Sequence, residues 1–403
     1  MSINTSSGSN NRWHVLALAA LTFAFVVALP QICMSVLFKE ISADLGLNLV
    51  EIGVIWGTPP LAAIFIVLLG GLLADRYGAR RTMGVACLLA GVAGALRGIS
   101  GDFISLMFIT FLFGLAIWII PASVFKTTAT WFSGKQLLLA NAVVSAGMGF
   151  GYTLGAMISA TILSPLLGGW RDVLFLCGGI SIIVGLLWLF AVREPARLGS
   201  TGSGGSVPLR QAISHVFPIK AIWLLGLTLL GYIGCTQGVI GYMPTYLRDI
   251  GWTVAGADGT VAAFNGVSTL GVIPLALLSE RLGLRKVVLF PILFVTIVGV
   301  ALLPVVGNAA VWVLMIMVGV SRDGFMAIAL TMSTEAEGVG AVYAGTAAGL
   351  AQTMLNVGSF SSPPLGNSLA NINPCFPFFL WAAFGLLALV AFYFVRETGW
   401  RRG

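Results

Sequence analysis

Two charged residues, Arg322 and Asp323, lie side by side within a long apolar segment that runs from Ala310 to about Met332. Arg322 lies about 12 residues into that segment, which is roughly 18 Å at the rise of an α-helix. This depth is near the midplane of a hydrocarbon core about 30 Å thick. A charge there costs on the order of 2.5–3.5 kcal/mol, so we expect the pair to handle a substrate, an ion or a proton.

The chemistry of the two side chains suggests different roles. A guanidinium stays charged and offers a planar fork that matches a carboxylate, so Arg322 suits an anionic ligand. Asp323 is the one carboxylate of 14 that is not near a predicted span end or in a loop, which makes it the candidate for proton coupling. Burial and a neighbouring cation act on its proton affinity in opposite directions. The alternative is structural: an ion pair, or an arginine that holds backbone carbonyls.

The composition predicts a helical membrane protein to position this pair. The 403 residues are 58% hydrophobic and only 9% charged, whereas soluble domains carry about 25% charged residues. The apolar stretches are too long for the strands of a membrane barrel. We count twelve spans, at residues 13–38, 48–73, 82–100, 103–131, 136–162, 172–192, 220–246, 257–279, 286–305, 310–333, 338–362 and 376–396.

The distribution of polar and basic residues predicts the organisation of these spans. A flexible stretch at 199–206 lies between the sixth and seventh spans. We therefore expect a six-helix bundle at 1–192, a cytoplasmic linker at 193–219 and a second six-helix bundle at 220–403. Fifteen of the 21 Lys and Arg residues fall on one side of the spans and four on the other. This bias predicts a multi-pass protein of the cell membrane with both termini in the cytoplasm.

An internal repeat supports the division into two bundles. The segment from Leu72 to Arg81 follows span two, and the segment from Leu277 to Lys286 follows span eight. The two align without gaps at an offset of 205 residues. Parallel repeats of this kind are typical of transporters whose substrate site lies between the halves, near the midplane.

The chain resembles the major facilitator superfamily on these features together. The loop from Gly71 to Arg81 is similar to the signature loop of that family, with Ala79 where a basic residue is usual, and its echo has Glu280 in place of the aspartate. The segments 244–251 and 338–349 resemble the cyanate, nitrate and organic-anion branches. The resemblance implies alternating access by rocking of two bundles, with spans one, four, seven and ten lining a cavity.

The repeated loops are the predicted gates. Asp75 lies where a carboxylate can accept amides at the start of span three, and Gly78 permits a tight turn. The alternative is a basic loop that sets topology, with a capped helix. The predicted gating residues are Asp75, Arg76, Gly78, Arg80 and Arg81, with Glu280, Arg281 and Arg285 in the second loop.

Polar residues on the spans that the resemblance places around the cavity complete the predicted site. These are Gln31 on span one and Tyr232, Gln237 and Tyr242 on span seven, although each could be a hydrogen bond between helices. Lys126, near the inner end of span four, either snorkels to the interface or attracts an anion at the inner mouth. Arg97, near the outer end of span three, is expected to snorkel.

The resulting prediction is a secondary active transporter, a symporter of the cell inner membrane that moves a small carboxylate-like anion with protons. The alternative is an exporter of hydrophobic or amphipathic compounds, although the antiporter motifs of spans four and five are missing. A membrane receptor on the same scaffold is a third possibility, but the tails are short. We expect a monomer in the lipid bilayer that is not an enzyme. No nucleophile–base set, metal cluster or nucleotide-binding loop is apparent, so no catalytic residue, metal, cofactor or nucleic-acid partner is predicted.

Overall fold

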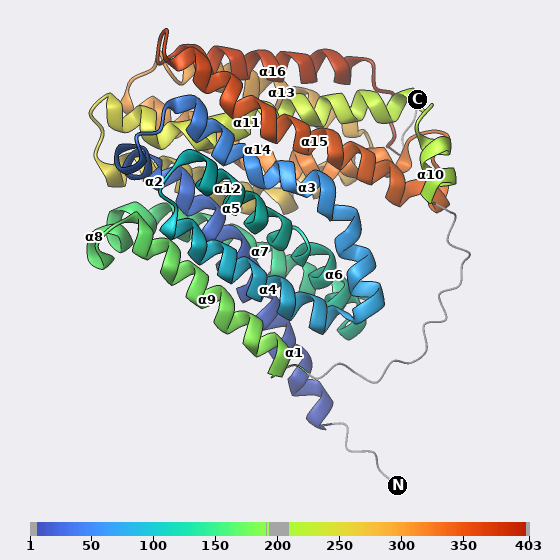
Figure 1. Cartoon of the computed structure of the whole chain (residues 1–403). Helices are drawn as coiled ribbons and strands as arrows, with labels where there is room; N and C mark the ends of the chain where they lie inside the picture. Colours follow the sequence, from blue (N-terminus) through green and yellow to red (C-terminus); the bar gives the residue numbers. More distant parts are fainter. Residues whose placement is uncertain (1–5, 191, 193–208, 400–403) are drawn as a thin grey trace. The chain divides into compact units, whose positions relative to one another are not determined.

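The computed structural model describes residues 6–190, 192 and 209–399, and the regular structure in those residues is entirely helical (Figure 1). Helices are expected because backbone groups in a bilayer must find their hydrogen bonds within the chain. Eleven helical stretches of the described residues are long and apolar enough to cross a membrane. The prediction of an all-α membrane protein is confirmed.

The twelfth predicted span, 338–362, corresponds to α15 (Gly340–Ala370), a helix of 31 residues. It is not among the eleven apolar stretches. Its amides and hydroxyls, among them Gln352, Asn356 and Ser362, make it more polar than the others. Asn356 and Ser362 are buried, and the Ser362 hydroxyl donates to the carbonyl of Gly234 at 2.6 Å. Part of the polar surface of α15 therefore faces the interior of the protein.

The helices form two compact units. The first holds residues 6–47 and 62–192. Its elements, besides the second part of α3 (Leu49–Tyr77), are α1 (Ser6–Thr22), η1 (Phe23–Ala28), α2 (Leu29–Leu45), α4 (Ala79–Leu96), η2 (Arg97–Ile99), α5 (Phe103–Ile117), α6 (Ile120–Trp131), α7 (Gly134–Ile158), η3 (Ser159–Leu163), α8 (Ser164–Leu167) and α9 (Trp170–Phe190). The core of this unit packs around Phe23, Phe113 and Trp188.

Several spans of the first unit are not continuous α-helices. Span one contains the π-helical segment η1, and Pro30 follows it in the first turn of α2. Span five contains a second π-helical segment, η3. Span four is interrupted between Ile117 and Ile120, with Pro121 in the first turn of α6. Such interruptions are often found at functional positions of helices.

A stripe of glycines on α7 lets this helix approach span one closely. A Cβ atom added at Gly147 would lie 2.6 Å from the carbonyl oxygen of Ala20. One turn on, Gly151 meets the backbone of Ala24 in η1, and Gly155 meets Leu29. A larger residue at any of these positions would separate the two helices.

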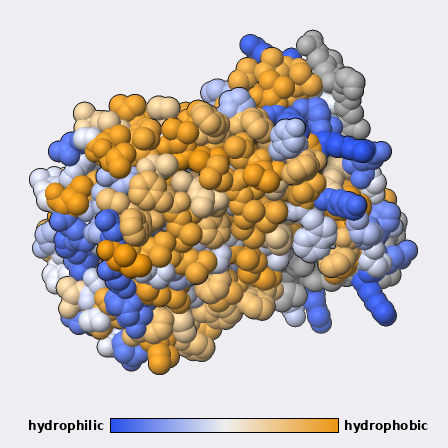
Figure 2. Space-filling view, turned by 90° about the horizontal axis from the view of Figure 1, so that it is seen from above, coloured by the Kyte–Doolittle hydropathy of each residue, from blue (hydrophilic) through white to orange (hydrophobic). Residues whose placement is uncertain are grey.

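The second unit holds residues 48–61 and 209–399. Besides the start of α3 and helix α15, its elements are α10 (Leu209–Val216), α11 (Lys220–Asp249), α12 (Val254–Leu282), α13 (Arg285–Leu302), α14 (Asn308–Glu335) and α16 (Phe376–Tyr393). Its core packs around Tyr232, Phe325 and Phe392. On its outer surface α16 exposes Phe379, Leu386 and Val390, and Figure 2 shows a broad apolar face with hydrophilic residues gathered towards its ends.

The first part of α3 is packed as a member of the second unit. Gly53 and Gly57 lie against the backbone of α15, where an added Cβ would lie 2.7 Å from Pro364 and 2.6 Å from Phe360. The Trp56 indole donates to the carbonyl of Gln237 at 3.0 Å. Residues 48–61 therefore group with the second unit, although they belong to the predicted first bundle.

The predicted linker is partly helical. Residues 193–208, including its glycine- and serine-rich part, lie outside the described residues. Helix α10 occupies the following segment, and buried Val216 joins a small apolar cluster with Ile222 and Ala347. The His215 ring stacks on Tyr343 at 4.1 Å, and its Nε2 lies 2.9 Å from the carbonyl oxygen of Gly338. The linker prediction thus missed a short helix that packs on the second unit, and the boundaries of the bundles remain a prediction.

Candidate functional site

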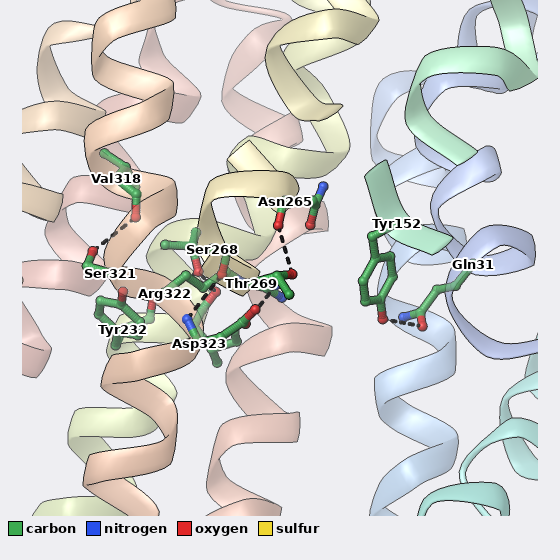
Figure 3. Close-up of polar contacts among 12 residues, drawn as sticks. Gln31, Tyr152, Tyr232, Asn265, Ser268, Thr269, Val318, Ser321, Arg322 and Asp323 are labelled. Carbon is green, nitrogen blue, oxygen red and sulfur yellow. Dashed lines mark hydrogen bonds and ion pairs between the residues drawn. The ribbon is translucent and has the colours of Figure 1, made fainter. Parts of the chain in front are cut away.

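Arg322 and Asp323 lie near the middle of α14 and contact each other. The Arg322 Nη1 is 3.4 Å from Asp323 Oδ1, and the side chains are 15% and 37% exposed respectively (Figure 3). This distance is at the long end for a charged hydrogen bond, which is usually about 2.7–2.9 Å. The pair is therefore loose and partly open, and both groups retain surface for another partner.

Close packing of α12 on α14 builds the surroundings of this pair. Gly319 allows the approach, because a Cβ there would lie 2.6 Å from the carbonyl oxygen of Phe264. The Ser268 hydroxyl of α12 accepts a hydrogen bond from the backbone N–H of Asp323 at 3.2 Å. The Phe264 ring lies 6.0 Å from the Arg322 guanidinium carbon. Buried Asn265 donates to the Val261 carbonyl of its own helix at 2.8 Å.

Tyr232, on α11, lies on the side of this region that faces the core of the second unit. It is fully buried, and its ring stacks on Phe325 at a centroid distance of 3.9 Å. Its hydroxyl lies within interaction range of Ser321, Thr296 and Arg322, yet makes no hydrogen bond of good geometry among the described residues. In this structure Tyr232 supports the Arg322 region from within the unit and presents no surface to a ligand.

Gln237 and Tyr242 lie further along α11. Among the described residues, no contact joins either side chain to Arg322. Gln237 is buried, and its backbone carbonyl accepts from Trp56. Tyr242 packs among Phe378 and Trp381, and its hydroxyl donates weakly to the Pro374 carbonyl at 3.5 Å. Their assignment to a substrate site remains a prediction.

Gln31 and Lys126 belong to the first unit. The Tyr152 hydroxyl donates to Gln31 Oε1 at 3.0 Å, which ties α2 to α7 (Figure 3). Gln31 follows closely on the π-helical segment η1, so it lies beside an interruption of span one. The Lys126 ammonium donates to the Ala74 carbonyl near the end of α3 at 2.8 Å. Lys126 thus holds the backbone beside the first repeated loop.

The first repeated loop contains the expected turn, and the predicted role of Asp75 as a cap stays a prediction. Gly78 has φ +88° and is the N-cap of α4, with no side-chain cap. Asp75 lies in the last turn of α3, not at the start of α4, and its side chain lies outside the described residues. Arg80 donates to the carbonyls of Trp188 and Leu189 at the end of α9. Arg76 and Arg81 are exposed.

The second repeated loop is held by Glu397 in the segment that follows α16. Glu397 accepts hydrogen bonds from the backbone N–H groups of Arg285 at 2.9 Å and Lys286 at 2.8 Å, so it caps the start of α13. The Lys286 ammonium donates in return to the carbonyls of Tyr393 and Val395 beyond α16. Gly283 is in the left-handed region, at φ +64°.

The charged predicted gating residues of the second loop are placed near its surface. Arg285 pairs with Glu335 at 2.7 Å. Glu280 and Arg281 are exposed. A cavity of about 140 Å³ lies beside this loop and is lined by Ser279, Glu280, Arg285 and Thr331, among others.

Sequence reasoning placed Arg97 wrongly. It does not snorkel: only 1% of its surface is exposed. Its guanidinium lies 3.9 Å from the centre of the Phe113 ring and donates to the Pro30 carbonyl of α2 at 3.1 Å. No carboxylate pairs with it among the described residues. The small neighbours Gly94 and Gly98, which let other helices close over it, were the available signal.

A buried ion pair was also missed. Asp258, in the second turn of α12, is fully buried and pairs with Arg248 near the end of α11. In the sequence, Asp323 is the one carboxylate away from predicted span ends and loops, and no burial was predicted for Asp258. Asp258 lies close to a helix end, yet it is more buried than Asp323, because proximity to a span end does not determine burial by neighbouring helices.

Comparison with known proteins places these features in context. A family model described as Major Facilitator Superfamily matches residues 16–363. The 4-hydroxybenzoate transporter PcaK of Pseudomonas aeruginosa is 23% identical over 317 residues, covering 71% of this chain and 70% of the relative. The hexuronate transporter of Bacillus subtilis is 25% identical over 232 residues, 55% of this chain and 53% of the relative. A probable nitrate/nitrite antiporter, NarK1 of Thermus thermophilus, is 26% identical over 296 residues, covering 69% of this chain and 63% of the relative.

Solved structures share the fold at low sequence identity. A bacterial homologue of the human lysosomal transporter Spinster, in an inward-facing and unoccupied conformation, has a TM-score of 0.80 and 15% identity, with 96% of both chains covered. The nucleoside transporter NupG also has a TM-score of 0.80 and 15% identity, covering 95% of this chain and 99% of that one.

Proposed function

We propose that this chain carries a small organic anion together with a proton. The chain belongs to the major facilitator superfamily and is a membrane transporter rather than an enzyme. In this proposal Arg322 binds the anion and Asp323 carries the proton. The observation that carries the proposal is the loose, partly open pair of these two residues near the middle of α14.

The chemistry of the pair supports an anionic substrate. A guanidinium that is 15% exposed, and whose contact with its carboxylate is 3.4 Å long, retains donors for a second anion. The names of several relatives point the same way, because 4-hydroxybenzoate, hexuronate and D-glucarate are all carboxylates. With identities of only 23–25%, these names suggest a substrate class and no single compound.

Competition for one guanidinium would couple the anion to the proton. An anion bound to Arg322 weakens the electrostatic support that the guanidinium gives to the ionised form of Asp323. A proton then binds Asp323 more readily, and by linkage a protonated Asp323 leaves Arg322 free for the anion. Anion and proton therefore favour each other, which is the thermodynamic condition for symport.

The remaining parts of the proposal follow the family resemblance. We propose alternating access in a monomer of the inner cell membrane, with both termini in the cytoplasm. The repeated loops would act as gates: Arg80 in the first loop holds the end of α9, and Lys286 in the second holds the end of α16. The alternative function, export of hydrophobic or amphipathic compounds, requires no anion at Arg322.

Counterflow into proteoliposomes tests the proposal. A panel of labelled benzoates, uronates and aldarates would be compared with lipophilic cations, with and without an inward pH gradient. We expect at least one carboxylate class to exchange, and to accumulate when the gradient is imposed. Exchange of lipophilic cations with no exchange of any carboxylate would replace this proposal by the exporter.

A further inference from the structure

The linker helix α10 has two apolar faces. Ala212 and Val216, four residues apart, are 6% and 0% exposed, and Val216 belongs to an apolar cluster of the second unit. Ile213 and Phe217, also four residues apart, are 45% and 57% exposed. The Phe217 N–H donates to the Ile213 carbonyl at 2.9 Å, so Phe217 continues the helical pattern beyond Val216. Packing on the second unit explains the first face and leaves the second uncovered among the described residues.

The uncovered face lies close to the level at which α11 enters the membrane. Helix α11 is one of the stretches apolar enough to span a membrane, and it begins at Lys220. Only residues 217–219 separate it from α10, and three extended residues span at most about 10 Å. The Trp223 indole, in the first turn of α11, donates to the Phe217 carbonyl at 2.8 Å, and the two rings pack edge to face at 5.0 Å. Tryptophan is enriched at the boundary between hydrocarbon and headgroups, so Phe217 belongs near that boundary.

The charged residues that flank the exposed apolar pair are basic. Arg210 lies one turn before Ile213, Lys220 lies three residues after Phe217, and both basic residues are exposed. Residues 209–223 contain no Asp or Glu. A helix with an exposed apolar face and basic residues beside it is typical of segments that lie in the plane of a membrane surface. Basic residues at that level are attracted to anionic lipids.

We propose that α10 and Phe217 form an anchor on the membrane surface. Ile213 and Phe217 insert into the headgroup region, and Arg210 and Lys220 contact the phosphates of anionic phospholipids. The anchor fixes the beginning of the second unit relative to the bilayer surface. It does not depend on the proposed transport reaction, because none of these residues belongs to the Arg322 site.

Lipid suits the exposed face better than the rest of the linker does. Residues 193–208 contain only two large apolar residues, Leu198 and Val207, and are otherwise rich in glycine and serine. Such a composition offers little apolar surface to cover Ile213 and Phe217. A bilayer, by contrast, offers both an apolar layer and phosphates at the level where α11 begins.

Fluorescence quenching in lipid vesicles tests the anchor in the full chain. Cys375, the one cysteine that is not buried, is replaced by serine, and an environment-sensitive label is attached at Ile213→Cys or Phe217→Cys. Gln211→Cys is the matched control, because Gln211 is exposed on the same helix but points about 160° away from Ile213. Lipids with a nitroxide near the headgroup or near the end of the acyl chain report depth, and iodide reports contact with water.

We expect the labels at positions 213 and 217 to be quenched mainly by the nitroxide near the headgroup, at a depth of about 5–10 Å into the boundary. Iodide should quench the control label more strongly than these two. Equal iodide quenching at positions 211 and 213 would refute the anchor, because the face would then lie in water. Protection of position 213 from both quenchers would also refute it, since linker residues or a second copy of the chain would then cover the face.

Nitroxide lipids with different headgroups test the basic residues. At an equal low content in phosphatidylcholine vesicles, labelled phosphatidylglycerol should quench the probe at position 213 roughly twofold more than labelled phosphatidylcholine does. Arg210→Gln combined with Lys220→Gln should abolish this preference, whereas Arg281→Gln, at an exposed position on the second repeated loop, should retain it. Contact with anionic lipid would be refuted by equal quenching without these substitutions, or by a preference that survives the loss of both charges.

Discussion

Two arginines within the apolar spans of this protein are used in opposite ways. Arg97 is 1% exposed, its guanidinium is packed against Phe113, and it donates to a backbone carbonyl of α2. Arg322 is 15% exposed, lies 3.4 Å from a carboxylate and keeps an open edge. The first joins helices within its unit, and the second is the partly open group that we propose binds the anion.

The difference shows that the position of a charged residue within a predicted span does not reveal whether it joins helices or binds a ligand. Arg97 was expected at the membrane interface because it is close to a span end, yet it is the more buried of the two. A guanidinium has apolar faces that pack on an aromatic ring and a polar edge that satisfies carbonyls. It can therefore brace helices without a carboxylate, and only accessibility distinguishes a brace from a binding group.

The largest expected effect is on transport by Arg322→Gln. Loss of a charge-assisted contact to the anion, worth about 1.5–3 kcal/mol, should lower carboxylate uptake by about one to two orders of magnitude. The unfolding midpoint should change little, because the side chain is partly exposed. Uptake normalised to protein in the vesicles checks this. Arg396→Gln, at an 88% exposed side chain, is the control and should transport normally.

The next effect is on stability, through Arg97→Ala. The substitution leaves a space beside Phe113 and removes the donor to the Pro30 carbonyl, so we expect a loss of about 2–4 kcal/mol in the free energy of unfolding. Denaturation monitored by tryptophan fluorescence would measure it. Uptake per folded molecule should fall far less than in Arg322→Gln. If the Arg97→Ala protein had normal stability but no uptake, Arg97 would act in transport and the contrast with Arg322 would be wrong.

A third substitution, Asp323→Asn, sharpens the role of the open arginine. In the proposed mechanism a proton on Asp323 frees Arg322, so we expect the apparent affinity for the anion to rise as the pH falls. Asparagine cannot take up the proton, so the affinity of the variant should no longer vary with pH in the range where the wild type responds. Counterflow should survive while accumulation driven by a pH gradient is lost. Persistent gradient-driven accumulation would assign the proton to another residue.

The smallest effect is expected from Arg80→Gln, which tests a partly exposed arginine that joins two helices. Arg80 donates to the Trp188 and Leu189 carbonyls, and water can replace part of this contact. We expect a loss of about 0.5–1.5 kcal/mol in unfolding free energy, read from the shift of the denaturation midpoint. Arg81→Gln, in the same loop but exposed, is the matched control with little expected change. A loss as large as that of Arg97→Ala would mean that the exposed fraction of an arginine does not predict how much it stabilises the contact between helices.

Much of the architecture could be predicted because its cause is local. Length and apolarity of a segment suffice for a spanning helix, and the 205-residue repeat predicted equivalent loops with turn glycines at Gly78 and Gly283. The equivalence extends in part to the contacts of the loops: Trp188 and Tyr393, whose carbonyls accept from Arg80 and Lys286, are also 205 residues apart, although Lys286 corresponds in the repeat to Arg81 and not to Arg80.

The remainder depended on which helices meet, which a single sequence does not specify. The burial of Arg97 requires α2 and α5 to close over it, and the burial of Asp258 requires Arg248 to reach it from α11. The π-helical segment η1 and the grouping of residues 48–61 with the second unit are likewise results of packing. The contact between Arg322 and Asp323 was left open, since neighbours on a helix point about 100° apart.

The packing of residues 397–399 on the second repeated loop has a practical consequence for work on this protein. Glu397 caps α13, and Gly399 is pressed against the carbonyl of Gly283, where a side chain would not fit. A reporter or tag inserted close to Gly399 would therefore disturb this contact, and truncations should not remove Glu397.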